Sequence, residues 1–320
     1  MCSFERTERS RMAERPRSTV APRLSVVIVN WNARSHLLRC LTSLEENPPE
    51  CTWEAIVVDN GSTDGSVDAL RTAAPWVRVV ENRANRGLPA ANNQGFLAAK
   101  GELLLVSNPD VVYRPGSITR LCNALDRHAR AAIVVPQLLQ QDGQRQTSAG
   151  SLPTLREAVT GSLTRRTPTT ATSGFWWHSW AHDEERRIDH GAEACYLVRR
   201  AAVIDVGPQD ERFPLDWEGI DWSARMADAG WEVWFVPAAV IEHAGGVSVK
   251  QTPYRWIVSS HRGMYRYFRR RQPAALLPLF AVMIGARAGV KLCAEALGRH
   301  LYDRAHRLAR IDDQPRNAGS

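Results

Sequence analysis

The sequence Asn108-Pro109-Asp110 directly follows the apolar run 102–107 and has the clearest chemical potential in the chain. A short apolar run that starts after a glycine and ends at Asn-Pro is typical of a buried strand in a parallel sheet. Open α/β sheets bind their ligands beyond the carboxyl ends of such strands. The sequence therefore predicts that Asp110 binds a metal ion or faces the phosphates of a nucleotide, with an ordinary Asn-Pro-Asp turn as the alternative.

The elements that would position this turn alternate between strands and helices. We predict strands from the apolar runs at 24–29, 55–58, 77–80 and 102–107, and helices from the spacing of apolar residues in 37–44 and 89–100. This alternation is typical of βαβ units with right-handed crossovers. The predicted fold class is therefore α/β, with a mostly parallel central sheet flanked by helices.

The second half of the chain is less regular. We predict strands at 131–139, 193–199 and 231–241, and a helix over 221–229 that ends at Gly230. Pro237 should confine part of the last strand to a sheet edge. Residues 140–190 lack periodicity, as is typical of a functional loop. Their tryptophans, Trp176, Trp177 and Trp180, can either stack on sugar rings or pack beneath the loop.

Composition limits the class of protein. The 320 residues, 44% hydrophobic and 23% charged, suffice for one large soluble domain and an appendage. A net charge of +7 favours an anionic partner. The basic residues are scattered or lie in the tails, so we expect no nucleic acid partner. Six cysteines without CxxC spacing are expected to be reduced thiols of a cytosolic protein.

The two ends of the chain differ from its middle. Residues 1–21 are polar and Arg-rich, without the apolar stretch of a secretory signal, and we expect a disordered leader. Near the other end, the basic cluster 266–271 precedes the apolar residues 274–286, which are too few for a typical transmembrane helix. We therefore expect 251–320 to be a helical, membrane-associating segment whose apolar run forms an interfacial helix on anionic lipid, with a helix packed on the preceding domain as the alternative.

Several motifs follow one another in order along the chain. They are Asn30-Trp31-Asn32, Asp59 to Ser66, Asn85-Arg86-Gly87, Asn92-Asn93-Gln94-Gly95, Asn108-Pro109-Asp110, Gly191-Ala192 with Leu197-Val198-Arg199-Arg200, Asp210-Glu211-Arg212-Phe213 and His243-Ala244-Gly245-Gly246-Val247-Ser248. Together they resemble the motifs of inverting family 2 glycosyltransferases with the GT-A (Rossmann-like) fold. Within that family the chain is most similar to the rhamnosyltransferase-like branch, which builds bacterial cell-wall or surface polysaccharide. The resemblance covers about residues 23–245 and makes 22–250 the catalytic domain.

The resemblance implies a divalent metal, Mn²⁺ or Mg²⁺. Asp110 would be the metal-binding carboxylate of an Asp-x-Asp-like motif whose first position is Asn108 here. The metal would thus lose one anionic ligand, and His243 is the natural supplement. Such a cation stabilises the charge on a departing nucleoside diphosphate. An ordinary loop histidine is the alternative for His243.

The resemblance also implies a nucleotide pocket. Asp59 would accept a hydrogen bond from the imide N–H of uracil or thymine, because an ionised carboxylate is only an acceptor. The donor would then be dTDP- or UDP-linked. The other residues expected to bind the nucleotide-sugar are Asn30, Asn32, Asn85, Arg86, Gly87, Asn92 and Asn108.

An inverting transfer needs a base for the proton of the acceptor hydroxyl. The position that matches the family's base aspartate is Gly219. The nearby candidates are Glu218 first, then Asp221, which is also a plausible helix N-cap, and then Asp216.

Three kinds of protein follow from these observations. The first is an enzyme that moves a sugar, such as L-rhamnose, to a glycan or polyprenyl-diphosphate acceptor. Such an enzyme would lie at the cytoplasmic face of the membrane, where Arg199 and Arg200 can meet a lipid diphosphate. Gly219 favours a second class, a non-catalytic sugar-nucleotide- or glycan-binding subunit. A sugar nucleotidyltransferase is disfavoured, because no Gly-rich loop follows the first strand.

Overall fold

The computed structural model describes residues 21–155, 157, 176, 180–213, 216–245 and 253–312, with side chains described as far as residue 298. The expected leader up to residue 20, Trp177, and Gly246 to Ser248 of the last motif lie outside the described residues.

A central sheet of ten strands carries the fold. Its main path runs, in spatial order, through β3 (Arg78–Glu81), β2 (Trp53–Asp59), β1 (Leu24–Asn30), β4 (Leu103–Ser107), β11 (Cys195–Arg199), β6 (Ala131–Leu139), β12 (Glu232–His243) and β5 (Val111–Tyr113). The short strands β7 (Arg145–Gln146) and β9 (Arg186–Ile188) pair with β6 and β12. A separate pair is formed by β8 (Ala149–Gly150) and β10 (His190–Gly191).

The four strands β3, β2, β1 and β4 are parallel, as the alternating pattern predicts. After β3 the chain crosses to the other side of β1 to form β4, so the sheet has a topological switch point between β1 and β4. Such a point leaves a crevice at the carboxyl ends of the strands. β11 is antiparallel to β4, with Cys195 opposite Ser107 and Arg199 opposite Leu103. The start of β11 therefore lies at the ligand-binding edge and its end at the opposite edge.

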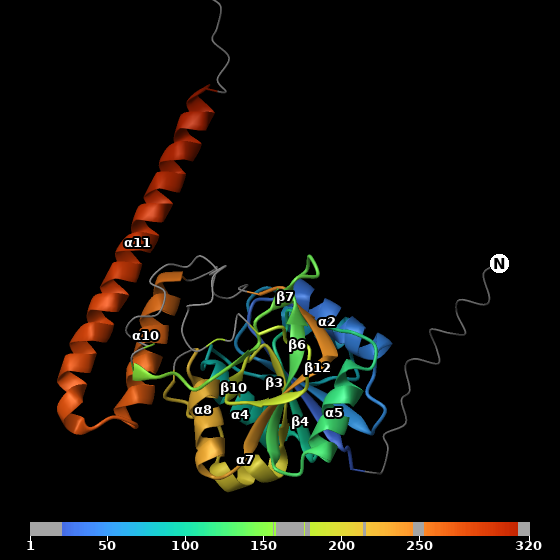
Figure 1. Ribbon diagram of the computed structural model, residues 1–320. Helices are drawn as coiled ribbons and strands as arrows, with labels where there is room; N and C mark the ends of the chain where they lie inside the picture. Colours follow the sequence, from blue (N-terminus) through green and yellow to red (C-terminus); the bar gives the residue numbers. More distant parts are fainter. Residues whose placement is uncertain are drawn as a thin grey trace, which may run out of the picture.

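Helices cover both faces of the sheet (Figure 1). On one face pack α2 (Arg34–Glu46), α3 (Ser66–Ala73) and α5 (Ser117–Arg127), and on the other α4 (Leu88–Ala98), α7 (Arg200–Val206) and α8 (Glu218–Asp228). Trp222 of α8 is fully buried and stacks on Phe96 of α4, with ring centroids 5.7 Å apart. Burial of so large a side chain stabilises the fold by about 2–3 kcal/mol and fixes α8 over the sheet.

A third apolar cluster joins α8 to the C-terminal helices. Trp217 and Ile220 of the α8 region pack with Tyr267 and Phe268 of α10 (Pro253–Arg269) and with Phe280 of α11 (Leu277–Asp312). A turn of 3₁₀ helix at Ala274–Leu276 precedes α11. Beyond this contact α11 stands away from the sheet domain (Figure 1).

α11 is longer than the apolar run in the sequence indicates. Within the described residues, the segment Ala274–Gly298 is the one helical stretch long and apolar enough to cross a membrane, with a mean hydropathy of 1.7. Only 11% of its most apolar part is buried. Arg287 interrupts the apolar run in the sequence, whereas the helix continues through it.

Two expectations about local structure have different outcomes. Pro237 lies between the part of β12 that pairs with β9 (233–235) and the part that pairs with β5 (241–243), so among the described residues no strand pairs with this side of β12 at the proline, as expected. The register between β12 and β6 shifts from Val236 to Val240, so a bulge accommodates the missing N–H of the proline. Asp221 is not a helix cap, because α8 begins at Glu218 with Trp217 at the N-cap.

Candidate active site

The carboxyl ends of β1 and β2 bring Asn30 and Asp59 side by side. The two residues are register partners, and both are almost completely buried. The amide Nδ2 of Asn30 donates to Oδ2 of Asp59 at 2.9 Å, and the backbone N–H of Ser62 donates to Oδ1 at 2.9 Å. The carbonyl Oδ1 of Asn30 is shielded from solvent and has no partner among the described residues. This corner therefore retains an unused acceptor.

Asn32 and the turn after β2 form the wall of the same corner. The Oδ1 of Asn32 accepts the backbone N–H of Thr63 at 2.8 Å, and the hydroxyl of Ser62 accepts the backbone N–H of Asn32 at 2.9 Å. Asn32 has a φ of 50°, a left-handed conformation that asparagine tolerates better than most residues. These bonds hold the loops after β1 and β2 in one arrangement.

Asn60 organises the segment 82–87, a role that the sequence did not reveal. Its Oδ1 accepts the backbone N–H of Arg86 at 3.0 Å, and its Nδ2 donates to Oδ1 of Asn85 at 3.0 Å and to the carbonyl of Gly87 at 3.2 Å. The three predicted nucleotide-binding residues 85–87 are thus fastened to the end of β2. The Asn-Gly-Ser sequence that follows Asp59 could have indicated that the side chain of Asn60 binds backbone groups of a neighbouring loop.

The predicted nucleotide-sugar residue Asn92 faces another part of the molecule. It is buried in α4, and its Nδ2 donates to Oε1 of Gln209 at 2.9 Å. The neighbouring Asn93 donates to the carbonyl of Gln209 and accepts its backbone N–H. Both asparagines therefore hold the loop after α7, which carries the segment Asp210 to Phe213.

The pairing of β5 with β12 brings Asp110 and His243 together. His243 is the register partner of Val111, and the backbone N–H of Ala244 donates to the carbonyl of Asp110 at 3.0 Å. Nε2 of His243 lies 3.5 Å from Oδ1 of Asp110. The other ring nitrogen, Nδ1, lies 3.0 Å from Oε1 of Gln146 on β7. Gln146 thereby fixes the orientation of the imidazole.

The electrostatics of this pair favour a bound cation. Burial acts to raise the pKa of Asp110, but the hydrogen bond and charge of His243, with a smaller effect of His36, outweigh it and hold the pKa below its usual value. Asp110 is therefore ionised at neutral pH. With Nδ1 held by Oε1 of Gln146, Nε2 is the ring nitrogen that would bind a cation placed next to the carboxylate.

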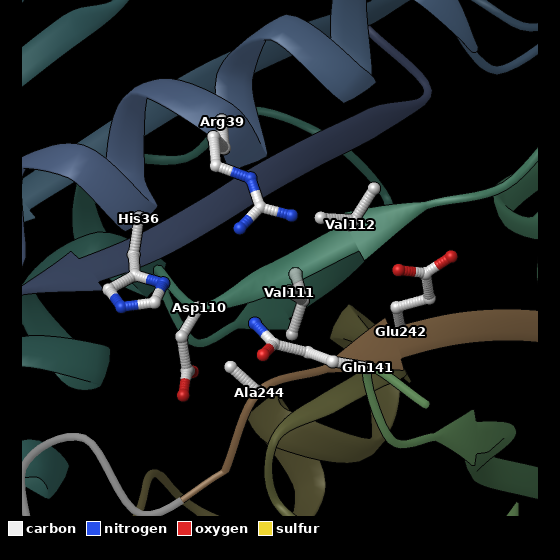
Figure 2. Close-up of a pocket in the computed structure, with 8 residues that line it drawn as sticks. All are labelled: His36, Arg39, Asp110, Val111, Val112, Gln141, Glu242 and Ala244. Carbon is white, nitrogen blue, oxygen red and sulfur yellow. The ribbon is translucent and has the colours of Figure 1, made fainter. Parts of the chain in front are cut away.

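Figure 2 shows a small pocket that is lined by Asp110 and by Ala244, the residue after His243. His36 of α2 points to the same opening as Asp110, and Arg39 of the same helix lies over Val112. The sequence analysis did not identify His36 and Arg39. Their basic side chains lie in the first turns of the helix that follows Asn32, and this position could have indicated them.

The residues present fit a divalent cation that shares its coordination with a substrate. No group of three or more His, Cys, Asp or Glu side chains suited to a metal occurs in the described part of the chain. One carboxylate and one imidazole leave most positions of an octahedral ion open. Mg²⁺ and similar ions are commonly held in this way, with phosphate and water oxygens as the remaining ligands.

The three predicted base candidates have different environments. Glu218 is 1% exposed, and its Oε2 accepts the backbone N–H of Trp217 at 2.9 Å. Asp221 is fully buried and is paired with Arg225 of its own helix and with Arg270 and Arg271 at the end of α10. Asp216 has a φ of 76°, and burial raises its pKa to about 6, while hydrogen bonds from Trp256 and Ser260 of α10 act in the opposite direction.

A fourth carboxylate, Glu193, lies directly beside this group. It precedes β11, and its Oε1 accepts the backbone N–H of Gly219 at 2.9 Å. Burial and the charge of Glu218 raise the pKa of Glu193 well above its usual value. In the sequence, Glu193 is the one acidic residue in the mostly apolar run from Gly191 to Val198, and this could have indicated a functional carboxylate.

Three basic residues expected at a lipid or its diphosphate have internal partners instead. Arg199 donates to the carbonyls of Ala131 and Leu125, and Arg200 donates to the carbonyl of Gly101, all at the sheet edge opposite the site. Arg270 joins Asp210 and Asp221. The antiparallel direction of β11 is the reason that Arg199 and Arg200 point away from the site. Of the loop tryptophans, Trp180 packs on Phe235 with ring centroids 5.0 Å apart.

Comparison with known proteins identifies the family. The model described as "Glycosyl transferase family 2" matches residues 25–185. The N-acetylglucosaminyl-diphospho-decaprenol L-rhamnosyltransferase of Mycobacterium tuberculosis is 32% identical over 264 residues, which is 78% of this chain and 84% of that protein. An uncharacterized glycosyltransferase of a Nostoc species is 34% identical over 102 residues, 31% of each chain.

Solved structures confirm the predicted GT-A fold. A mannosyltransferase from Pyrobaculum calidifontis in complex with GDP-Man and Mn²⁺ superposes with a TM-score of 0.53 at 16% identity, covering 96% of this chain and 87% of that one. A crystal structure of GalNAc-T7 with UDP, GalNAc and Mn²⁺ has a TM-score of 0.52 at 19% identity, covering 71% of this chain and 44% of that one. With a family model over half its length and a relative over most of it, this chain is a glycosyltransferase of family 2.

Proposed function

We propose that this enzyme transfers a sugar, L-rhamnose, with inversion from a dTDP- or UDP-linked donor to a polyprenyl-diphosphate-linked sugar at the membrane. The observation that carries the proposal is the 32% identity to an L-rhamnosyltransferase across 84% of that relative, whose named acceptor is a decaprenol-linked N-acetylglucosamine. The alternative of a non-catalytic binding subunit has no support from this relative.

The base of the donor fits the corner formed by Asn30 and Asp59. An imide N–H of uracil or thymine needs an acceptor, and Oδ1 of Asn30 is unused while the carboxylate of Asp59 keeps further lone pairs. Because both groups are already fixed by neighbouring bonds, little ordering is required when the donor binds. Asn85, Arg86 and Gly87 would line the approach to this corner.

The diphosphate of the donor fits the opposite side of the crevice. Asp110 and His243 would hold a divalent ion, which supplies electrostatic stabilisation of the leaving diphosphate when it is bound. The contact between Nδ1 of His243 and Oε1 of Gln146 would leave Nε2 as the nitrogen that binds the metal. His36, which faces the same opening, adds positive charge near the phosphates when it is protonated.

A panel of sugar nucleotides tests this function. Nucleoside diphosphate release would be measured for dTDP-rhamnose, UDP-sugars and GDP-sugars, with a polyprenyl-diphosphate-N-acetylglucosamine acceptor and with Mn²⁺, Mg²⁺ or EDTA. We expect acceptor-dependent release from dTDP-rhamnose, loss of activity in EDTA, and a product of inverted anomeric configuration. Release from GDP-sugars alone would contradict a dTDP- or UDP-linked donor, and retained configuration would contradict transfer with inversion.

We also propose that α11 holds the enzyme on the inner face of the membrane. Its exposed apolar side chains include Leu279, Val282, Val290 and Leu297, and little of the helix is covered by protein. We expect the intact protein to sediment with anionic vesicles and a variant that ends at residue 272 to remain soluble while still binding the donor. Equal vesicle binding by both proteins would exclude this role of α11.

A further inference from the structure

The space beside Gly219 is already filled by another side chain. A Cβ placed on Gly219 would lie 2.1 Å from Cδ, 2.3 Å from Oε1 and 2.6 Å from Cγ of Glu193. Real Cβ atoms are essentially never found within 3.0 Å of another heavy atom. The carboxylate of Glu193 therefore occupies the volume into which a side chain at position 219 would project. The position of the Glu193 side chain therefore requires a glycine at 219.

The sheet explains how Glu193 reaches this position. β11 runs antiparallel to β4, and the backbone N–H of Asn108 donates to the carbonyl of Ala194 at 2.8 Å. Glu193 is therefore the chain neighbour of Ala194, which is bonded directly to the turn that carries Asp110. The first turn of α8 then supplies the N–H of Gly219, which binds Oε1 and fixes the carboxylate.

One oxygen of Glu193 has no partner within the described part of the chain. The side-chain Oε2 is shielded from solvent and accepts no hydrogen bond there. An unpaired buried oxygen of this kind costs free energy, so its presence in a folded protein calls for an explanation. The hydroxyl group of an acceptor sugar would satisfy it.

We propose that Glu193 is the catalytic base of the transfer reaction, with its carboxylate in the place that the family pattern gives to residue 219. This inference rests on the proposed function. The acceptor oxygen forms a bond to C1 of the donor sugar, while the bond from C1 to the phosphate oxygen breaks. The electron pair of that bond leaves with the nucleoside diphosphate, and the hydroxyl proton moves to Oε2 of Glu193.

The other carboxylates have positions that suit supporting roles. Oε2 of Glu218 is bound to the N–H of Trp217, and Asp221 is neutralised by arginines. Glu218, Asp216 and the phenol of Tyr196 are the titratable groups that face Glu193. After burial, the charge of Glu218 has the largest effect on the pKa of Glu193, and it raises it. Once ionised, a carboxylate of raised pKa is a stronger base and accepts a hydroxyl proton more readily.

The test compares Glu193→Gln with the matched surface variant Glu46→Gln in the full-length protein. Transfer would be measured with dTDP-rhamnose and the lipid-linked acceptor, and donor affinity with Mn²⁺ present. We expect Glu193→Gln to lower kcat by roughly 10²–10⁴-fold with donor Kd unchanged, and to remove the acidic limb of the pH profile. Glu46→Gln should match the wild type.

A second test moves the carboxylate from position 193 to position 219. It separates the loss of a base from a folding defect in the single variant. In Glu193→Ala combined with Gly219→Asp, the carboxylate returns to α8, and we expect at least tenfold higher kcat than in Glu193→Ala alone. A folded, donor-binding double variant with no gain would overturn the exchange. If the wild type is active and Glu193→Gln is equally active, Glu193 is not the base, although the proposed function stands. A wild type that binds the donor without any transfer would overturn the proposed function as well.

Discussion

The two sides of the crevice are built differently. On the proposed donor side, polar residues at the ends of β1 and β2 bind one another through short-range loops, and almost every group has a partner. On the proposed acceptor side, Glu193, just before β11, lies near Glu218 and Asp216 at the start of α8, and all three have raised pKa values. The donor side is thus pre-arranged at little cost, whereas ionising the crowded acids of the acceptor side costs stability.

Because of this contrast, we expect the two sides to affect different quantities, donor affinity on one side and turnover on the other. Side chains whose hydrogen bonds are already formed can position a nucleotide without rearranging when the nucleotide binds. Buried carboxyl groups that raise one another's pKa values are stronger bases when they ionise, but their crowding costs stability. Variants on the two sides should therefore differ in what they change, with binding constants on one side and turnover or unfolding on the other.

The largest effect is expected on the donor side at Asp110. Asp110→Asn removes the anionic ligand of the proposed metal site but keeps the shape of the side chain. We expect donor binding in Mn²⁺ to weaken, and activity to fall roughly 10³-fold or more, on the order of 4 kcal/mol. Titration calorimetry with and without Mn²⁺ measures this. Asp142→Asn in an exposed turn is the matched control, and equal metal response in both variants would remove Asp110 from the site.

The next effect is expected in stability at Asp221. Asp221→Asn leaves Arg225, Arg270 and Arg271 without their shared buried carboxylate. Because those arginines are partly exposed, we expect a loss of about 2–3 kcal/mol in the free energy of unfolding, below the full cost of a broken buried pair. Urea denaturation measures it, with kcat per folded molecule preserved. Unchanged stability together with lost turnover would return Asp221 to the candidate bases.

A smaller effect is expected at Asn60. Asn60→Ala removes three hydrogen bonds that hold the segment 85–87 against the end of β2. We expect the KM for the donor to rise roughly tenfold, about 1.4 kcal/mol, with little change in kcat. Steady-state kinetics at saturating acceptor measures it. A drop in kcat at constant KM would show that this segment acts on the acceptor side.

The smallest effect concerns the pH dependence of stability at Asp216. Its pKa is raised to about 6 in the folded protein, mainly by burial, so the folded state binds a proton more tightly than the unfolded state. Stability contributed by this proton is present below about pH 4 and is lost as the pH rises through 6. Asp216→Asn should therefore gain about 1 kcal/mol in the free energy of unfolding at pH 8 and little at pH 4. A gain that is equal at both pH values would contradict the shift.

Much of the donor side could be predicted from the sequence because its signals are local. The apolar runs before Asn30, Asp59 and Asn108 fixed both the strands and the edge to which these residues belong. Asn92 is an exception, since its partner Gln209 lies 117 residues away. That the donor-side residues bind a nucleotide remains a prediction.

The acceptor side could not be predicted in the same way. Gly219 was visible as a departure from the family pattern, but its contact with Glu193 joins residues 26 apart through the insertion of an antiparallel strand. The same insertion carries Arg199 and Arg200 to the far edge. Arg270 meets Asp221 across 49 residues because α10 folds back on α8. No periodicity within one element contains this information.

The close fit between Gly219 and Glu193 also constrains how the protein can change over generations. Any side chain gained at 219 collides with the carboxylate at 193, and loss of that carboxylate leaves glycine beside an empty space. A side chain gained at 219 therefore forces the carboxylate of Glu193 to move away from its hydrogen bond. We expect the two positions to change together among relatives, with a small residue at one of them wherever the other holds an acid.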